Sequence, residues 1–303
     1  MQHSINPKVD CVFKAVLGSE ENRALLIDFL NAMLTETLPS PVVEVQILNP
    51  YNPQETLNDK LTIVDVKARD AAGQVFQIEI QLLVYAELRA RILYGWADLY
   101  RRQLRSGEAY SALKPTYAIW LLDQTLRHDT PAYAHRYRMR DDRGQDLIDH
   151  GGIWIFELNK AAVQQVITEQ DRWLKFFNEA ETLDDETLPE WMQTPVMRQA
   201  MSTLTAFSEK DRAYHAYRAR QEFLRQQLSI QQALEEERAA KEAERQAKEV
   251  ERQAKEAERQ AKEAALQDKE AALQAKEAER QAKEAALAEV ARLQALLNQS
   301  RDA

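Results

Sequence analysis

The sequence predicts an α/β protein in which a mixed sheet packs against helices, followed by a helical region and one long C-terminal helix. Three observations predict this fold class. Segments with the apolar pattern of strands alternate with helical segments in the order helix, three strands, helix, strand. The chain has 303 residues, which suffices for one sizeable domain and a further region. A seven-residue repeat fills most of the sequence after residue 240.

Two helices and one strand are predicted at the start of the chain, at residues 9–17, 20–38 and 42–48. The first helix ends at Gly18, because glycine is common just beyond the last turn of a helix. Ser19 is expected to cap the second helix, whose first turn carries acids that suit the positive end of the helix dipole. Pro39 ends this second helix, since proline cannot continue it.

The next two predicted strands, residues 61–68 and 75–83, form a tight hairpin. The loop between them ends at Gly73, which tolerates the positive φ that such a turn requires. If Asp70 pairs with Gln74, residue numbers across the hairpin sum to 144. In this register Asp65 lies directly opposite Glu79, with Cβ atoms about 4.5–5.5 Å apart.

Two carboxylates at this distance repel each other unless a cation lies between them. Lys67 faces Gln77 in the same register, so no basic side chain directly opposite neutralises the acids. Converging carboxylates form a hard oxygen site suited to Mg²⁺ or Mn²⁺. The alternative interpretation is an ordinary solvated face at the edge of a hairpin.

Beyond the hairpin the pattern alternates between helix and strand and then becomes helical. The predicted elements are a helix at 86–106, strands at 116–122, 133–139 and 152–158, and helices from residue 163 onward. The continuous apolar run of the 116–122 strand indicates burial on both faces. Glu157 is expected to face solvent, and the aromatic cluster at residues 173–177 is expected in the core.

The C-terminal repeat predicts a long helix, because AKEAERQ and close variants recur every seven residues from Ala240. Glutamates precede lysines by four residues, as in Glu244 and Lys248, a spacing that stabilises an isolated helix. Alanine at the a/d seam buries little area, so we expect weak self-association, anchored by larger side chains between Val290 and Leu297. A solitary solvated helix is the alternative. We therefore divide the chain into a core (1–160), a helical region (161–229) and a heptad-repeat helix (230–303), either a coiled coil or a single helix.

Composition excludes several classes of function. A net charge of −9 gives no bulk electrostatic attraction to nucleic acid, so any such contact must come from local patches. The single cysteine excludes an internal disulfide, and no apolar run approaches the roughly 20 residues of a membrane span. These features indicate a cytoplasmic protein that does not enter membranes. The sequence also lacks a glycine-rich phosphate loop, and its histidines lack the spacing of a zinc site.

Asp65 and the Glu79-Ile80-Gln81 tripeptide, on two adjacent predicted strands, resemble the core of the PD-(D/E)XK nucleases. Three segments narrow the resemblance to the branch of recombination-promoting nucleases and transposases: VDCVFKAVLG, DKLTIVDVKARDAAGQVFQIEIQ and SALKPTYAIWLLD. The resemblance covers about residues 5–180, and the heptad array lies outside it. It implies a restriction-endonuclease-like core and metal-dependent hydrolysis of DNA phosphodiester bonds.

The resemblance also implies roles for individual residues. Asp65 matches the metal-binding aspartate and Glu79 the acid of the (D/E)XK motif, and the Ile80 carbonyl is a further expected metal ligand. Asp10 matches the acid of the first helix, which helps to shape the metal site in this superfamily. Gln81 occupies the position of the motif's lysine, as is usual in this branch, and its amide would orient the attacking water.

Gln81 lacks the charge of the usual lysine, so another cation is expected to stabilise the developing negative charge. Lys67 lies on the same face as Asp65 and is the preferred substitute, with Lys60 as the alternative. Arginines of the 86–106 helix are candidates to bind phosphates that flank the cleaved bond. These are Arg89, Arg91, Arg101, Arg102 and Arg105.

Two functions from different classes therefore follow. The first is a Mg²⁺-dependent DNA endonuclease that acts in recombination or in transposition of mobile DNA, as the resemblance implies. The second is a catalytically inactive DNA- or protein-binding module whose helical tail acts as a coiled-coil scaffold. The intact acids Asp65 and Glu79 favour the first, whereas the net acidity of the chain and Gln81 favour the second.

Overall fold

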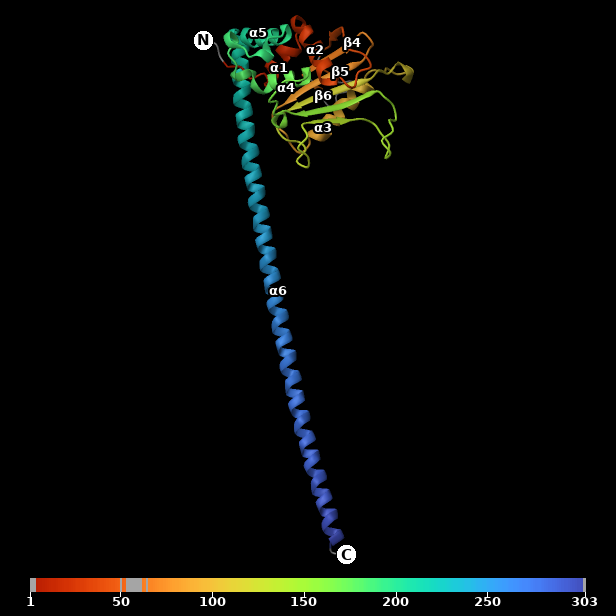
Figure 1. Ribbon diagram of the computed structural model, residues 1–303, viewed down its shortest axis with the longest axis vertical. Coiled ribbons are helices and arrows are strands. Elements are labelled where there is room, and N and C mark those ends of the chain that lie inside the picture. The colour runs from red at the N-terminus through yellow and green to blue at the C-terminus, as the bar shows by residue number, and fades with distance from the viewer. Residues whose placement is uncertain (1–3, 50, 53–61, 64, 302–303) are drawn as a thin grey trace. The chain divides into compact units, whose positions relative to one another are not determined.

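Figure 1 shows the computed structural model, which describes residues 4–49, 51–52, 62–63 and 65–301. The chain divides into two compact units, Met1–Leu228 and Ser229–Ala303. The first unit contains a sheet with helices, and α6 (Asp211–Arg301) continues from it into the second unit. The predicted α/β fold with a long C-terminal helix is confirmed.

Among the described residues, six strands form one mixed sheet in the order β1-β4-β5-β6-β8-β7. The three central strands β5, β6 and β8 are parallel, and the outer strands pair with them or with one another antiparallel. A separate short ladder joins β2 to β3. The strands are β1 (Val45–Ile47), β2 (Tyr51–Asn52), β3 (Thr62–Ile63), β4 (Val66–Asp70), β5 (Val75–Gln81), β6 (Thr116–Leu122), β7 (Ala134–Tyr137) and β8 (Gly151–Glu157).

Helices cover both faces of this sheet (Figure 1). On one face α1, α2, α4 and α5 form the main hydrophobic core with side chains such as Phe76, Ile78 and Trp154. On the other face α3 packs over β6 and β8 in a smaller core that includes Trp120 and Ile155. The helices are α1 (Asp10–Leu17), α2 (Arg23–Leu34), α3 (Leu88–Arg101), α4 (Glu169–Glu179) and α5 (Pro195–Glu209).

Several predicted elements are confirmed with shorter bounds, and one detail is wrong. The predicted Ser19 cap does not form: residues Glu20–Asn22 make a 3₁₀ turn and α2 starts at Arg23. Gly18 does end α1, but its φ is −105° and not left-handed. Its small size matters instead, because a Cβ there would lie 2.9 Å from the Lys14 carbonyl and 3.2 Å from the Val66 side chain.

The predicted strand over residues 61–68 is divided in the structure. β3 and β4 are separate, and Asp65 forms a bend immediately before β4. Leu61, Val64 and the alternative lysine Lys60 lie outside the described residues. The strand predicted at 116–122 is confirmed in full and is buried throughout.

The helical region packs against the sheet within the first unit. α4 begins with a capping box in which Thr168 and Asp171 bond reciprocally to each other's backbone amides. The predicted aromatic cluster at 173–177 is confirmed as core, since Trp173 and Phe177 are fully buried against Phe29 of α2. No helix in the described part of the chain combines the length and apolarity that crossing a lipid bilayer requires.

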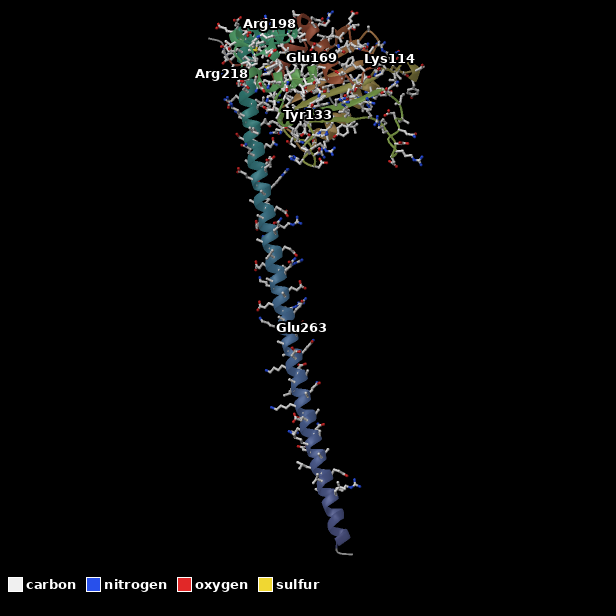
Figure 2. All side chains as sticks on the ribbon, viewed as in Figure 1. Lys114, Tyr133, Glu169, Arg198, Arg218 and Glu263 are labelled. Carbon is white, nitrogen blue, oxygen red and sulfur yellow. The ribbon has the colours of Figure 1, made fainter. Side chains whose placement is uncertain are left out.

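The C-terminal part of α6 is a helix with solvent-exposed side chains, as Figure 2 shows around Glu263. The predicted i,i+4 ion pairs Glu244–Lys248, Glu251–Lys255 and Glu258–Lys262 are all present. At about 1.5 Å per residue, the 91 residues of α6 span roughly 137 Å. Its self-association stays a prediction.

Candidate active site

The β4–β5 hairpin has the register predicted from its turn. Ladder pairs run from Val66↔Ile78 to Arg69↔Val75, so paired residue numbers sum to 144. The turn closes with the Asp70 amide donating to the Gln74 carbonyl at 3.1 Å, and Gly73 has a φ of +84°. The ladder ends at the pair Val66↔Ile78, and Asp65 lies in a bend at the next position outward, where its charge acts on Glu79.

Glu79 is buried under α3 and does not face solvent. Its exposed fraction is 4 %, and that of Gln77 on the same face is 1 %. Helix α3 approaches this face closely at Gly95, where a Cβ would lie 3.4 Å from the Gln77 amide nitrogen. The Gln77 amide donates to Glu79 Oε1 at 3.0 Å. The interpretation of this face as a solvated hairpin edge is therefore wrong.

Asp65 binds the neighbouring strand and the first helix. Its Oδ2 accepts a hydrogen bond from the Ile80 amide at 3.0 Å, and its Oδ1 lies 3.1 Å from Lys14 Nζ. Lys14 comes from α1, so the cation at this acid lies 51 residues away in the sequence. The sequence gives one indication of the contact between Lys14 and Asp65. Lys14 lies four residues after Asp10, and therefore on the same face of the first helix.

Burial raises the pKa of both carboxyl groups. Burial is the main cause that raises the pKa of Asp65, while the Ile80 amide and Lys14 oppose the shift. Burial and then the charge of Asp65 raise the pKa of Glu79 to about 8, although the Gln77 amide and Arg91 act in the opposite direction. The acids therefore hold a proton together at neutral pH when no cation is bound.

Gln81 and Arg91 complete the polar surface beside these acids. Arg91 Nη2 lies 4.0 Å from Glu79 Oε2, and Arg91 Nη1 lies 3.5 Å from Gln81 Oε1. The Gln81 amide donates to the Leu83 carbonyl at 3.0 Å. The Arg91 guanidinium also lies over the Trp120 ring, 5.7 Å from its centroid, which fixes it against the sheet.

The comparison with known protein families matches residues 7–233 to the PD-(D/E)XK nuclease family transposases. The chain belongs to this family. The match covers the sheet, all helices packed on it and the start of α6, and so extends well beyond the motif segments. No curated protein and no solved structure matches the chain. Membership supports a role related to nuclease action or transposition, and nucleases of this superfamily typically use divalent metals.

Two further residues expected in the PD-(D/E)XK site have other neighbours. The charges that act on Lys67 are those of Arg102, Arg69 and Asp98, and burial lowers its pKa. The lysine that contacts Asp65 is Lys14. Asp10 forms an ion pair with Arg220 of α6 at 3.1 Å, and its charge also raises the pKa of Asp65.

The donor set of this nuclease-family site fits a hydrated divalent ion. Among the described residues no group of three or more histidine, cysteine, aspartate or glutamate side chains converges. Asp65 and Glu79 therefore offer two carboxylates, and Mg²⁺ commonly keeps several waters beside one or two such ligands. The amide and carbonyl of a strand residue point to the same side, so the Ile80 carbonyl shares the side on which its amide meets Asp65.

The arginines of α3 differ in their surroundings. Arg101 and Arg102 both pair with the buried Asp98, at 3.3 Å and 2.8 Å, and so contribute to the structure of the helix. Arg91 faces the acid pair, and Arg89 donates to the Leu126 carbonyl on another side of the helix. Only part of the predicted arginine cluster thus lies near the candidate site.

Proposed function

We propose that this protein is a divalent-metal-dependent endodeoxyribonuclease, with Mg²⁺ or Mn²⁺ as cofactor, that acts in recombination or transposition of mobile DNA. The observation that carries the proposal is the acid pair at the end of the β4–β5 hairpin, in which Glu79 is buried and the Asp65 side chain is 12 % exposed. Burial raises the pKa of both acids, and the charge of Asp65 raises that of Glu79 further, so keeping both ionised costs stability even with Lys14 and Arg91 nearby. Family membership makes cation-assisted DNA hydrolysis the function that explains why the protein keeps two acids together at a cost in stability.

The residues that would hold the metal are Asp65, Glu79 and the carbonyl of Ile80. A divalent ion bound there supplies a water of lowered pKa and neutralises negative charge on the phosphate. Burial of Glu79 under α3 fixes its carboxylate, and the Ile80 amide fixes that of Asp65. These contacts keep the two ligands in place before DNA binds.

We assign the charge of the missing strand lysine to Lys14 in preference to Lys67. The Lys14 ammonium already lies at the acid pair, 3.1 Å from Asp65. Its side chain is 39 % exposed, so it can turn from Asp65 toward a phosphate oxygen once another cation satisfies the acid. Gln81 is uncharged and would orient the water through its amide oxygen, which Arg91 helps to position.

The test is a plasmid-nicking assay with Mg²⁺ or Mn²⁺, repeated with EDTA. Asp65→Ala and Glu79→Ala should each abolish cleavage without unfolding the protein. Asp142→Ala, which removes an exposed acid from the loop between β7 and β8, is the matched control and should cleave normally. Wild-type rates in the Asp65 or Glu79 variants would refute the assignment of the site.

The alternative function, a catalytically inactive DNA- or protein-binding module, rests on Gln81 in place of lysine. The same assay separates the two functions. A wild-type protein that binds DNA but shows no metal-dependent cleavage, on supercoiled or linear substrates, would favour the binding module.

A further inference from the structure

A cavity lies on the α3 face of the sheet, and neither Asp65 nor Glu79 lines it. Its volume is about 550 Å³, within the range of ligand-binding pockets. Apolar side chains from three elements form its walls, among them Ile92 of α3, Leu126 of the loop after β6, and Ile155 of β8. Arg89, Arg127 and Tyr137 add polar groups to the lining.

One wall of the cavity is held by a buried ion pair that the sequence did not reveal. Glu157 was expected to face solvent, but its exposed fraction is 0 %. Its Oε1 accepts from the Arg127 amide at 2.9 Å, and its Oε2 lies 2.6 Å from Lys160 Nζ. Lys160 also donates to the Thr130 carbonyl at 2.9 Å. Glu157 and Lys160 thus fix the backbone of the loop over residues 126–130.

A buried ion pair adds little net stability, but its geometry fixes what is bonded to it. The loop it holds carries Leu126, Arg127 and Asp129, all of which line the cavity. Arg127 is fixed in turn by both Asp129 oxygens and by the Tyr137 hydroxyl, which its Nη1 approaches to 3.2 Å. The cavity is therefore preformed, which reduces the entropy lost when a ligand binds.

The charges of the cavity suit an anionic ligand. Arg89 and Arg127 contribute two positive charges and Asp129 one negative charge. Within the described part of the chain, Arg89 uses one of its five N–H donors, which bonds to the Leu126 carbonyl at 2.7 Å. Apolar walls with an aromatic ring and a net positive edge fit a ligand that has a flat apolar body and a phosphate.

The cavity lies close to the candidate active site across the sheet. Glu79 pairs with Trp120 in the β5–β6 ladder, and Trp120 pairs with Ile155 in the β6–β8 ladder. Neighbouring strands are about 4.8 Å apart, so the backbones of Glu79 and Ile155 lie about 10 Å from each other. Arg91 reaches from α3 toward Glu79, and Arg89 reaches from the same turn toward the cavity.

We propose that this cavity binds one unpaired deoxynucleotide of the DNA strand near the bond that is cut. The base lies against Leu93 and Tyr137, the exposed apolar residues of the lining. Arg89 and Arg127 bind its phosphate. Enzymes that act on DNA accept displaced bases in such pockets, and stacking on apolar and aromatic side chains tolerates any base. The proposal rests on the proposed nuclease function and adds a preference for DNA with an unpaired nucleotide.

The test measures binding in EDTA, where no cleavage occurs, by fluorescence anisotropy of labelled DNA. The wild-type protein should bind a short duplex with one unpaired nucleotide about tenfold more tightly than the fully paired duplex. Leu93→Trp fills the cavity from an exposed position, 56 % exposed, and should remove this preference. Arg89→Glu should remove it as well.

Two variants serve as controls. Tyr94→Trp alters the next residue, which is 51 % exposed and is not among the residues that line the cavity. Arg143→Glu reverses the charge of an exposed arginine in the turn between β7 and β8. Both should keep the tenfold preference. Equal binding of the two duplexes by the wild-type protein, or a preference that survives in Leu93→Trp, would overturn the proposal.

A free nucleotide carries the same base and phosphate as a nucleotide of the DNA strand. Titration with dAMP alone shows which of these two ligands the cavity binds. If dAMP binds in a way that Leu93→Trp abolishes, while the duplexes bind equally, the cavity serves free nucleotides and the strand proposal is overturned. Because binding is measured without metal, this outcome is independent of whether the wild-type protein cleaves DNA.

Discussion

Binding of a divalent metal to the acid pair should release close to one proton at neutral pH. The pKa of Glu79 is raised to about 8 by burial and by Asp65, so the carboxyl is mostly protonated at pH 7 before the metal binds. With that pKa, roughly 0.9 proton leaves per metal at pH 7, and the apparent Kd falls about 50-fold between pH 6 and pH 8. An acid with an ordinary pKa would release almost no proton over this range.

Isothermal titration calorimetry with Mn²⁺ measures this release, when it is repeated in two buffers of different ionisation enthalpy. Glu79→Gln should bind more weakly and release almost no proton. Lys14→Met should increase the release near pH 8, because the Lys14 charge lowers the pKa of both acids. A Kd that is constant from pH 6 to pH 8, with no proton released, would refute the reasoning.

The raised pKa of Glu79 also makes the stability of the metal-free protein depend on pH. A carboxyl whose pKa is higher in the folded state binds more protons when folded, so the free energy of unfolding falls as pH rises. For Glu79 the window runs from its ordinary pKa of 4.5 to about 8. The slope should be about 1.4 kcal/mol per pH unit within it. Urea denaturation should show this slope for the wild-type protein and lose it in Glu79→Gln.

Three further predictions concern other parts of the chain. Lys14→Met should reduce cleavage by about 100-fold or more while Mn²⁺ still binds, and Lys67→Met should reduce cleavage less. If nicking assays give the reverse order, Lys67 and not Lys14 supplies the positive charge during cleavage. Lys160→Met should cost about 3 kcal/mol in urea denaturation, because it leaves the buried Glu157 carboxylate without its ammonium partner. Glu157→Gln should cost less, because Lys160 is 15 % exposed and keeps its bond to the Thr130 carbonyl, and the double variant should cost less than the sum. A peptide of residues 230–303 should be strongly helical by circular dichroism at low temperature and lose some helicity with salt. Deletion of residues 231–303 should leave nicking intact but weaken double-strand cutting at low protein concentration.

The hairpin could be predicted from the sequence because its determinants are local. A period of two in each strand and a glycine at the end of the turn fix the register, and the register alone places Asp65 near Glu79. Similarly, the heptad repeat predicts its own helix and the ion pairs along it. Each of these features depends on residues within a few positions of one another.

The surroundings of the acids could not be predicted because they depend on distant elements. The burial of Glu79 results from α3, which crosses over Gln77 at Gly95, and nothing in the strand itself indicates that contact. Glu157 has the position of an exposed acid near a strand end, yet Lys160 folds back through a 3₁₀ turn to pair with it. The contact between Lys14 and Asp65 joins α1 to the hairpin across 51 residues.

The tail has more apolar side chains than the alanine seam suggests. Leu266, Leu273 and Leu287 are each at least 58 % exposed, and all three lie at one position of the seven-residue repeat. Arg280 occupies the same repeat position between Leu273 and Leu287 and interrupts this row. This position carries arginine at residues 245, 252, 259 and 280 and lies two residues after the last position of the alanine seam, so the exposed leucines do not strengthen that seam and association through it stays weak.

The glutamine at position 81 is consistent with cations that reach the site from helices. Arg91 Nη1 lies 3.5 Å from the Gln81 amide oxygen, so a lysine at position 81 would place two like charges side by side. Lys14 from α1 and Arg91 from α3 instead approach Asp65 and Glu79 separately. An uncharged residue between them leaves room for both cations, and the positive charge of the usual motif is then supplied by the packing of two helices on the sheet.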